Sequence, residues 1–124
     1  MRALTTEEDE KFLMDEVRMW AGGLTDCLWL SRIDPGHESR VAGVVRKLRV
    51  DPSANAVEAT ITDGTASLMA RWALADASRP VLGTVPGWAL ILEGVPRAGP
   101  DGPFMTEPHF EIVPGPRIGT TDRP

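Results

Sequence analysis

Several side chains of this chain have the types that metal binding or nucleophilic catalysis requires. Structural zinc sites use closely spaced Cys and His residues, whereas His37, His109 and the single cysteine, Cys27, show no such spacing. Ser31, Asp34 and His37 are the residue types of a catalytic triad, but they crowd into one short segment around a Pro-Gly turn. We interpret these three as solvated loop residues. The pattern therefore favours neither a metal centre nor an activated nucleophile.

Paired carboxylates and phosphate-binding loops are the other arrangements that would indicate catalysis. Glu107 and Glu111 stand on one side of an alternating run, but carboxylates on an exposed strand usually only keep the surface hydrated. The chain contains no glycine-rich loop of the phosphate-binding type. The sequence thus predicts a protein that is not an enzyme and that uses no cofactor.

Two short segments of the chain alternate apolar and polar side chains with a period of two. Residues 57–62 and 67–72 both alternate apolar and polar side chains, with Asp63-Gly64 between them, which is typical of a tight β-hairpin. The alternation predicts that the apolar members face the core: Val57, Ala59, Ile61, Leu68, Ala70 and Trp72. The outward side chains then include Thr60, Thr62, Ser67, Met69 and Arg71.

Three further strands accompany this hairpin. Residues 40–51 form the first strand, and Gly43 within it predicts a bend or bulge. Residues 87–96 form the fourth strand and residues 104–114 the fifth, where Pro108 indicates an edge or a bulge. The connecting segments are the turn at 51–56, an interlude at 73–86 and a loop at 97–103. Their order predicts a mainly β fold, the five-stranded Greek-key barrel called the OB-fold.

A helix is predicted at residues 5–21, with acidic residues in its first turn, where they favour the helix dipole. Gly22-Gly23 ends it. Its apolar stripe, Phe12, Leu13, Val17 and Trp20, should pack on the barrel or on another copy of the chain. We divide the chain into the helix and connector (1–36), the barrel (37–114) and a flexible tail (115–124).

Length and charge limit the class of protein. The 124 residues suit one domain, and the net charge of −5 argues against a surface that binds nucleic acid everywhere. The negative excess lies partly in the helix, because residues 1–34 hold four basic and eight acidic side chains against seven and nine in residues 37–114. One cysteine and no apolar span or signal peptide predict a cytoplasmic protein that does not contact a membrane.

Four stretches, RVAGVVRKLRV, VEATITDGTASLMARW, VPGWALILEGVP and FMTEPHFEIV, carry a family resemblance. The pieces that match are Val41-x-Gly43-x-Val45, Asp63-Gly64-Thr65 with Leu68 and Trp72, and the segment 87–94. Together they resemble small actinobacterial OB-fold nucleic-acid-binding domains. They are also similar to the wedge domain of the branch-migration helicase RecG and to the anticodon-binding domains of some tRNA synthetases.

The resemblance implies a binding face on the second and third strands, bordered by the loops between strands one and two and between strands four and five. On this sequence the face would carry Lys47, Arg49, Thr60, Thr62, Met69, Arg71 and Arg97. The cations would neutralise phosphates of single-stranded DNA or RNA, or of a structured nucleic acid. Neither the second nor the third strand offers an outward aromatic ring, although stacking on such rings is typical of single-strand binders. The pattern does not predict which face of the sheet Phe104 and Phe110 occupy. The alternative is a protein-interaction or oligomerisation module that uses the N-terminal helix.

Overall fold

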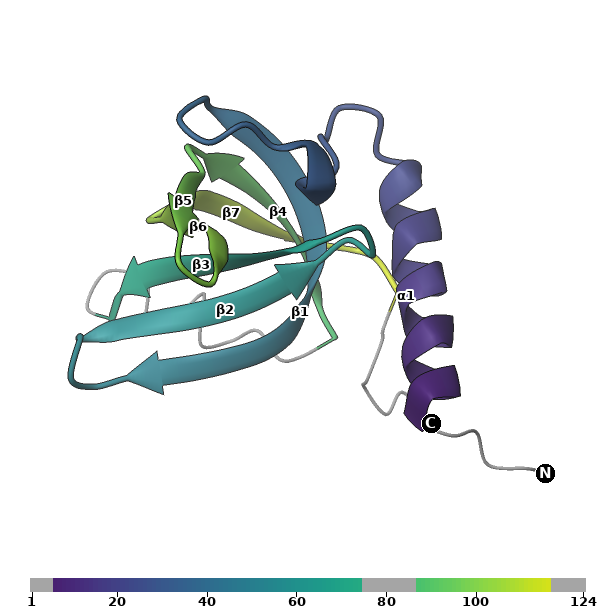
Figure 1. Ribbon diagram of the computed structural model, residues 1–124, viewed down its shortest axis with the longest axis horizontal. Helices are drawn as coiled ribbons and strands as arrows, with labels where there is room; N and C mark the ends of the chain where they lie inside the picture. Colours follow the sequence, from purple (N-terminus) through teal and green to yellow (C-terminus); the bar gives the residue numbers. More distant parts are fainter. Residues whose placement is uncertain (1–5, 75–86, 117–124) are drawn as a thin grey trace.

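The computed structural model describes residues 6–74 and 87–116, which fold as one helix lying against a strongly twisted sheet (Figure 1). The helix α1 spans Thr6–Gly22, and a single turn of 3-10 helix, η1, spans Leu30–Arg32. The strands are β1 (Ser39–Asp51), β2 (Ala56–Thr62), β3 (Ser67–Ala73), β4 (Ala89–Gly94), β5 (Arg97–Gly99), β6 (Gly102–Thr106) and β7 (His109–Val113).

The strands form one sheet in the order β5-β6-β3-β2-β1-β4-β7. All neighbours are antiparallel except β3 and β6, which are parallel. The expected fifth strand is divided into β6 and β7 because Glu107 has a positive φ of 55° and Pro108 has no N–H to donate. The halves pair with opposite ends of the sheet, so this segment links its two ends. Within the described residues the hydrogen-bonded order does not close into the expected five-stranded ring.

The core lies on the concave side of the sheet and follows the predicted alternation. Trp72 is only 3% exposed, and its indole Nε1 donates a hydrogen bond to the carbonyl oxygen of Pro108 at 2.9 Å. Its ring meets Phe110 edge-on, with centroids 5.2 Å apart. The predicted inward set is confirmed, because the following side chains are all buried: Val57, Ala59, Ile61, Leu68, Ala70 and Trp72. Val41 and Val45 of β1 and Leu92 of β4 are buried with them. Leu30 from the connector and Met105 from β6 complete the cluster.

A bulge in β1 decides which side chains of that strand face outward. The pairing with β2 shifts between Val45 and Lys47, which makes Arg46 the extra residue. Val45 and Leu48 therefore both contact the core, whereas strict alternation would have directed Lys47 inward. Lys47 and Arg49 are exposed on the opposite side.

Gly43 was expected to mark a bend or a bulge, and the bulge lies three residues further along, at Arg46. Gly43 pairs regularly with Leu90 of β4. A Cβ atom at this position would stand only 3.0 Å from the carbonyl oxygen of Thr62, so glycine is needed here for the close approach of β1 and β2.

The helix α1 packs on the convex side of β1 and β4, as predicted for one of its two alternatives. Val17 is fully buried and clusters with Val44 and Ala89. Trp20 Nε1 donates to the carbonyl oxygen of Pro114 at 3.2 Å, which joins the helix to the end of β7. These contacts give the apolar stripe its partner within the chain.

One member of the predicted stripe is wrong. Phe12 is 57% exposed, and Met14 packs near Val17 in its place. Phe12 and Val17 are separated by five helical steps, which is about 500°, so they project about 140° apart around the axis. Phe12 and Met19 thus remain on the outer side of the helix.

The β2–β3 hairpin is held by both the helix and the connector. The buried carboxylate of Asp63 accepts hydrogen bonds from the backbone N–H of Leu30 at 2.7 Å and of Thr65 at 2.9 Å. Gly64 has a φ of +90°, and a Cβ there would lie 2.8 Å from the carbonyl oxygen of Met14. The Asp-Gly pair therefore forms the turn and also its docking site on the rest of the molecule.

Other expectations concern the connecting segments. The expected loop at 97–103 contains β5 and the start of β6, which form a hairpin of their own. Most of the interlude, 75–86, and the end of the expected flexible tail, 117–124, lie outside the described residues. The described helices include none with the length and apolar character needed to cross a membrane.

Candidate functional site

The convex face of β1, β2, β3, β6 and β5 carries two parallel rows of side chains that follow the strand register. The first, which we call the open row, contains Lys47, Thr60, Met69, Phe104 and Arg97, one residue from each strand. The second, which we call the paired row, contains Arg49, Glu58, Arg71 and Thr106. Six of the seven predicted site residues thus stand in two adjacent rows.

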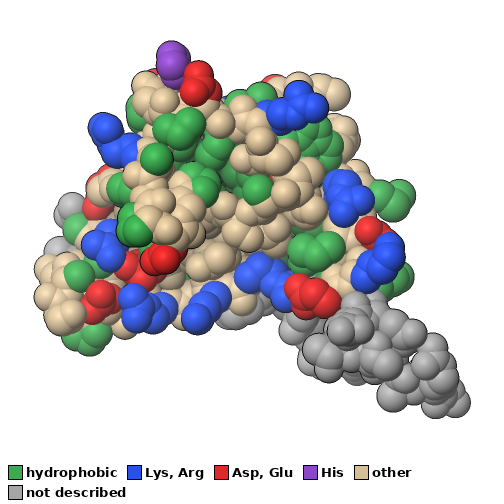
Figure 2. All heavy atoms as spheres, in the orientation of Figure 1, with side chains coloured by type: hydrophobic (Ala, Val, Ile, Leu, Met, Phe, Trp, Pro, Cys, Tyr) green, Lys and Arg blue, Asp and Glu red, His purple; other side chains and the backbone are tan. Residues whose placement is uncertain are grey.

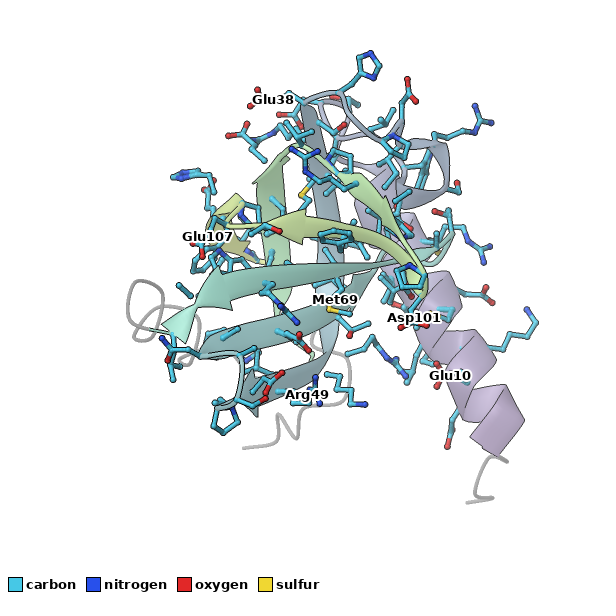
Figure 3. All side chains as sticks on the ribbon, turned by 60° about the vertical axis from the view of Figure 1, so that its left-hand side comes forward. Glu10, Glu38, Arg49, Met69, Asp101 and Glu107 are labelled. Atoms are coloured by element: carbon cyan, nitrogen blue, oxygen red, sulfur yellow. The ribbon has the colours of Figure 1, made fainter. Side chains whose placement is uncertain are left out.

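A groove lies between the face of β2 and β3 and the β5–β6 hairpin. Its volume is about 390 Å³. Met69 forms its floor near the centre of the sheet, and Asp101 stands at the hairpin tip (Figure 3). Thr60, Ser67, Arg71 and Phe104 also line it. The groove brings a ring, a thioether, hydroxyls and a guanidinium together, which suits an amphipathic planar ligand.

The paired row is held by a buried carboxylate. Glu58 is only 7% exposed although its side chain lies on the outer face, because two arginines cover it. It accepts a hydrogen bond from Arg49 Nη2 at 2.8 Å and from Arg71 Nε at 3.0 Å, with a further one from Arg71 Nη2. Hydrogen bonds from Arg49 and then Arg71 lower the pKa of Glu58, and the same contact raises the pKa of Arg49.

Asp51 adds a second acidic group to this cluster, with its Oδ2 3.8 Å from Arg49 Nη2. Two guanidinium groups and two carboxylates balance in formal charge. Figure 2 shows the same mixture, with basic and acidic side chains interleaved along the lower edge of the view, where β1 and β2 run. The paired row is therefore rich in hydrogen-bond donors and nearly neutral.

The open row has a different electrostatic character. Lys47 and Arg97 stand at its two ends, and among the described side chains, those of residues 9–74 and 87–116, no carboxylate lies within salt-bridge distance of either. Arg46 does not add to this row, because it pairs with Glu10 of the helix at 2.8 Å. Two cations thus remain available to an anionic ligand on this face.

The expectation that Thr62 lines the face requires correction. Thr62 is only 5% exposed, and its hydroxyl donates to the carbonyl oxygen of Ala66 at 2.8 Å. The same oxygen accepts from the N–H of Gly64 at 3.1 Å. Thr62 therefore stabilises the hairpin and offers no free group to a ligand.

Sequence reasoning missed Glu58 and Phe104 as members of the site. The outward position of Glu58 follows from alternation, but its two partners lie on neighbouring strands and require the register. Phe104 joins the open row through the parallel pairing of β6 with β3, which no local pattern announces. This ring supplies the aromatic surface that the two central strands lack.

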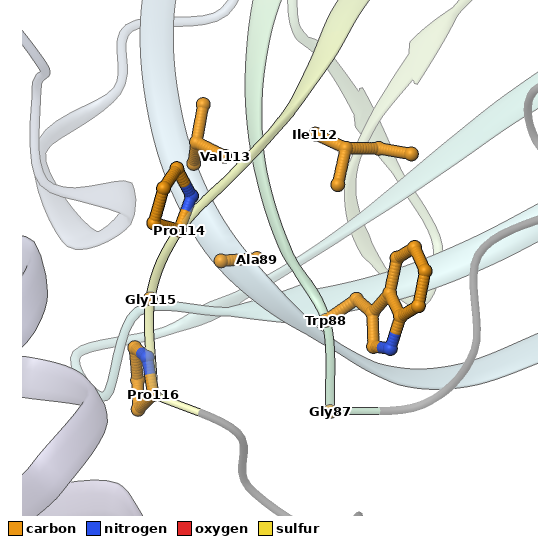
Figure 4. A pocket seen from close by; sticks show the side chains of 8 residues that line it. All are labelled: Gly87, Trp88, Ala89, Ile112, Val113, Pro114, Gly115 and Pro116. Atoms are coloured by element: carbon orange, nitrogen blue, oxygen red, sulfur yellow. The ribbon is translucent and has the colours of Figure 1, made fainter.

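The other chemical candidates do not assemble. The described residues contain no group of three His, Cys, Asp or Glu side chains that could hold a metal ion. Burial, together with Asp26, raises the pKa of the Cys27 thiol, which disfavours the nucleophilic thiolate. His37 pairs with Asp34 on the surface at 3.1 Å. A smaller hollow of about 270 Å³ beside Trp88 and Ile112 is mainly apolar (Figure 4).

No family model matches this chain, and no curated protein sequence matches it. Several solved structures match it. An OBody bound to hen egg-white lysozyme gives a TM-score of 0.60 at 16% identity, over 73% of this chain and 96% of that one. Asparaginyl-tRNA synthetase from Pyrococcus horikoshii gives 0.62 at 18%, over 73% and 23%. A replication protein A heterotrimer bound to ssDNA gives 0.52 at 17%, over 68% and 75%. These likenesses show the fold: the chain has an OB-fold with an N-terminal helix.

Proposed function

We propose that this chain is a non-enzymatic OB-fold module that binds single-stranded DNA or RNA weakly across the open row. The observation that supports it best is the row itself. In the strand register Lys47 and Arg97 stand at its two ends, and Met69 and Phe104, which line the groove, stand between them. Cations that contact phosphates and a ring that stacks on a base are the two elements of sequence-tolerant single-strand binding. The similar replication protein A structure has ssDNA bound.

Weak binding follows from the charges. Only two described cations of the face are unpaired, and the net charge of the chain is −5. Single strands lose affinity with salt at a slope of about −0.7 per neutralised phosphate, so two contacted phosphates give an expected slope of about −1.4. A shallow dependence of affinity on salt would also distinguish this site from a wholly basic surface, which contacts more phosphates.

The test is a salt titration of binding to labelled single-stranded DNA, single-stranded RNA and duplex DNA, monitored by fluorescence anisotropy. The double variant Lys47→Gln/Arg97→Gln should weaken binding to all sequences similarly and remove most of the slope, because phosphate contacts carry no base information. The matched control, Lys11→Gln/Arg32→Gln, removes the same charge from the helix and the connector and should leave the slope unchanged. Equal losses in both variants would contradict the assignment of the face.

The alternative function is a protein-interaction module. It is favoured by Phe12 and Met19, which are 57% and 77% exposed on the outer side of α1, and by the lysozyme bound to the similar OBody. If the wild-type chain binds no nucleic acid at low salt, the alternative replaces the first proposal. Sedimentation velocity of the wild type and of Phe12→Ser/Met19→Ser then measures whether the helix mediates self-association.

A further inference from the structure

We propose that Arg49 and Arg71 contact the bases of the bound strand rather than its phosphates, and that Glu58 is the positioning residue that holds them for this role. The inference rests on the proposed function and adds to it a division of labour between the two rows. Lys47 and Arg97 of the open row hold the phosphates. The paired row offers planar, neutralised donors to bases.

The first step of the argument is that phosphate would have to compete with Glu58. The carboxylate is 7% exposed and receives hydrogen bonds from both guanidinium groups. Moving the arginines onto a phosphate would leave this charge buried without partners, which is strongly unfavourable. With Asp51 beside Arg49, the cluster also has no net charge with which to attract a phosphate.

The second step is that the paired arginines remain accessible. The side chains of Arg71 and Arg49 are 44% and 59% exposed, so ligand can reach them while they stay bound to Glu58. Each guanidinium has N–H groups that Glu58 does not use. Arg71 donates to the carboxylate through both Nε and Nη2, which fixes its plane, whereas Arg49 is held through Nη2 alone. Unstacked bases pack on arginine planes and accept hydrogen bonds from such donors.

The third step is the position of these planes. Arg71 lines the groove with Met69 and Phe104, so a base that enters it meets a guanidinium and a ring. Lys47 and Arg97 lie four strand spacings apart, a path of about 19 Å measured along the curved sheet at about 4.8 Å per spacing. Phosphates are thus held at the two ends of the open row, and the groove between them is left to the bases.

The experiment compares two probes of about 12 nucleotides, within the range that one OB-fold covers. One is a single-stranded DNA of mixed sequence, and the other is an abasic strand with the same number of phosphates. The measured quantity is the ratio of their affinities, which isolates the contribution of the bases. The variants are Arg71→Lys, which keeps the charge but loses the plane, and Glu58→Gln, which keeps the shape but loses the charge. Lys47→Gln is the matched control.

We expect Arg71→Lys and Glu58→Gln each to reduce this ratio at least about fivefold, as loss of part of one stacked base would. Lys47→Gln should weaken both probes and leave the ratio unchanged. An unchanged ratio in Arg71→Lys and Glu58→Gln, including equally tightened binding of both probes after Glu58→Gln, would overturn the inference while leaving the proposed function intact. Absence of wild-type binding to either probe would overturn both. Thermal unfolding shows whether each variant is folded. If Glu58→Gln does not fold, Arg49→Lys takes its place.

Discussion

At the residue scale, two buried carboxylates organise this molecule in different ways. Asp63 accepts hydrogen bonds from backbone N–H groups and joins the connector to the hairpin. Glu58 accepts hydrogen bonds from two arginine side chains and shapes the candidate face. Asp63 is thus a structural anchor whose donors are neutral, whereas Glu58 forms ion pairs with two arginines next to solvent. Their substitution should therefore have different consequences.

Replacing Asp63 should destabilise the fold. Asp63→Ala removes the acceptor for the N–H groups of Leu30 and Thr65 and for the Thr65 hydroxyl, which lies 2.6 Å away. Because Asp63 is 1% exposed, water cannot simply replace it, and each unsatisfied buried donor costs about 1–3 kcal/mol. Urea unfolding measures the effect. Asp34→Ala, on the surface, is the control and should stay within about 0.5 kcal/mol of wild type.

Acid should weaken the fold partly through Glu58. Its folded pKa lies below the ordinary glutamate value of about 4.3, because Arg49 and Arg71 stabilise the charged form. A carboxyl group with a depressed folded pKa stabilises the fold above its unfolded pKa, and that contribution is lost as the pH falls through the folded value. We expect the wild type to lose stability on acidification below about pH 4.3 and Glu58→Gln to flatten this dependence. Identical pH profiles from urea unfolding would contradict the prediction.

At the element scale, the strands show what local patterns can and cannot predict. Alternation over β2 and β3 identified the inward side chains, because period two is a local property of each strand. The bulge at Arg46 depends on what the neighbouring strands require, so its position was not predictable. The break next to Glu107 falls where Pro108 had indicated an edge or a bulge. The parallel pairing of β3 with β6 is a long-range feature that no local pattern predicts. The position of Phe104 in the site depends on this pairing, so it was not predictable either.

The hairpin and the helix should prove coupled through Gly64. Gly64→Ala forces a side chain into a φ of +90° and against Met14 and Arg18 of the helix. Gly36→Ala is a matched control, because its φ is +94° but a Cβ there meets no atom within 4 Å. Both variants should lose stability from the backbone conformation. We expect Gly64→Ala to cost about 1–3 kcal/mol more, as overpacking does. If urea unfolding gives the same loss of stability for both variants, the helix moves away from the added methyl group at no cost, and the predicted coupling is absent.

At the scale of the whole molecule, the sheet depends on contacts that join its two ends. The strands β6 and β7 occupy positions near opposite ends of the hydrogen-bonded order, yet they belong to one segment of the chain. Trp72 of β3 reaches across this break, because it bonds the Pro108 carbonyl and packs against Phe110 of β7. The indole therefore holds together parts of the sheet that the strand ladder alone leaves apart.

Substitution of Trp72 should accordingly weaken the whole molecule rather than one strand. Trp72→Ala removes a large buried ring and should cost about 3–5 kcal/mol, with cooperative unfolding retained. Trp72→Phe keeps most of the apolar surface but leaves the Pro108 carbonyl without its donor, so it should cost less, with about 1 kcal/mol coming from the hydrogen bond. Trp88→Ala is the control, because Trp88 is 36% exposed. Urea unfolding followed by circular dichroism measures all three, and a Trp72→Ala loss no larger than that of Trp88→Ala would refute the role assigned to this residue.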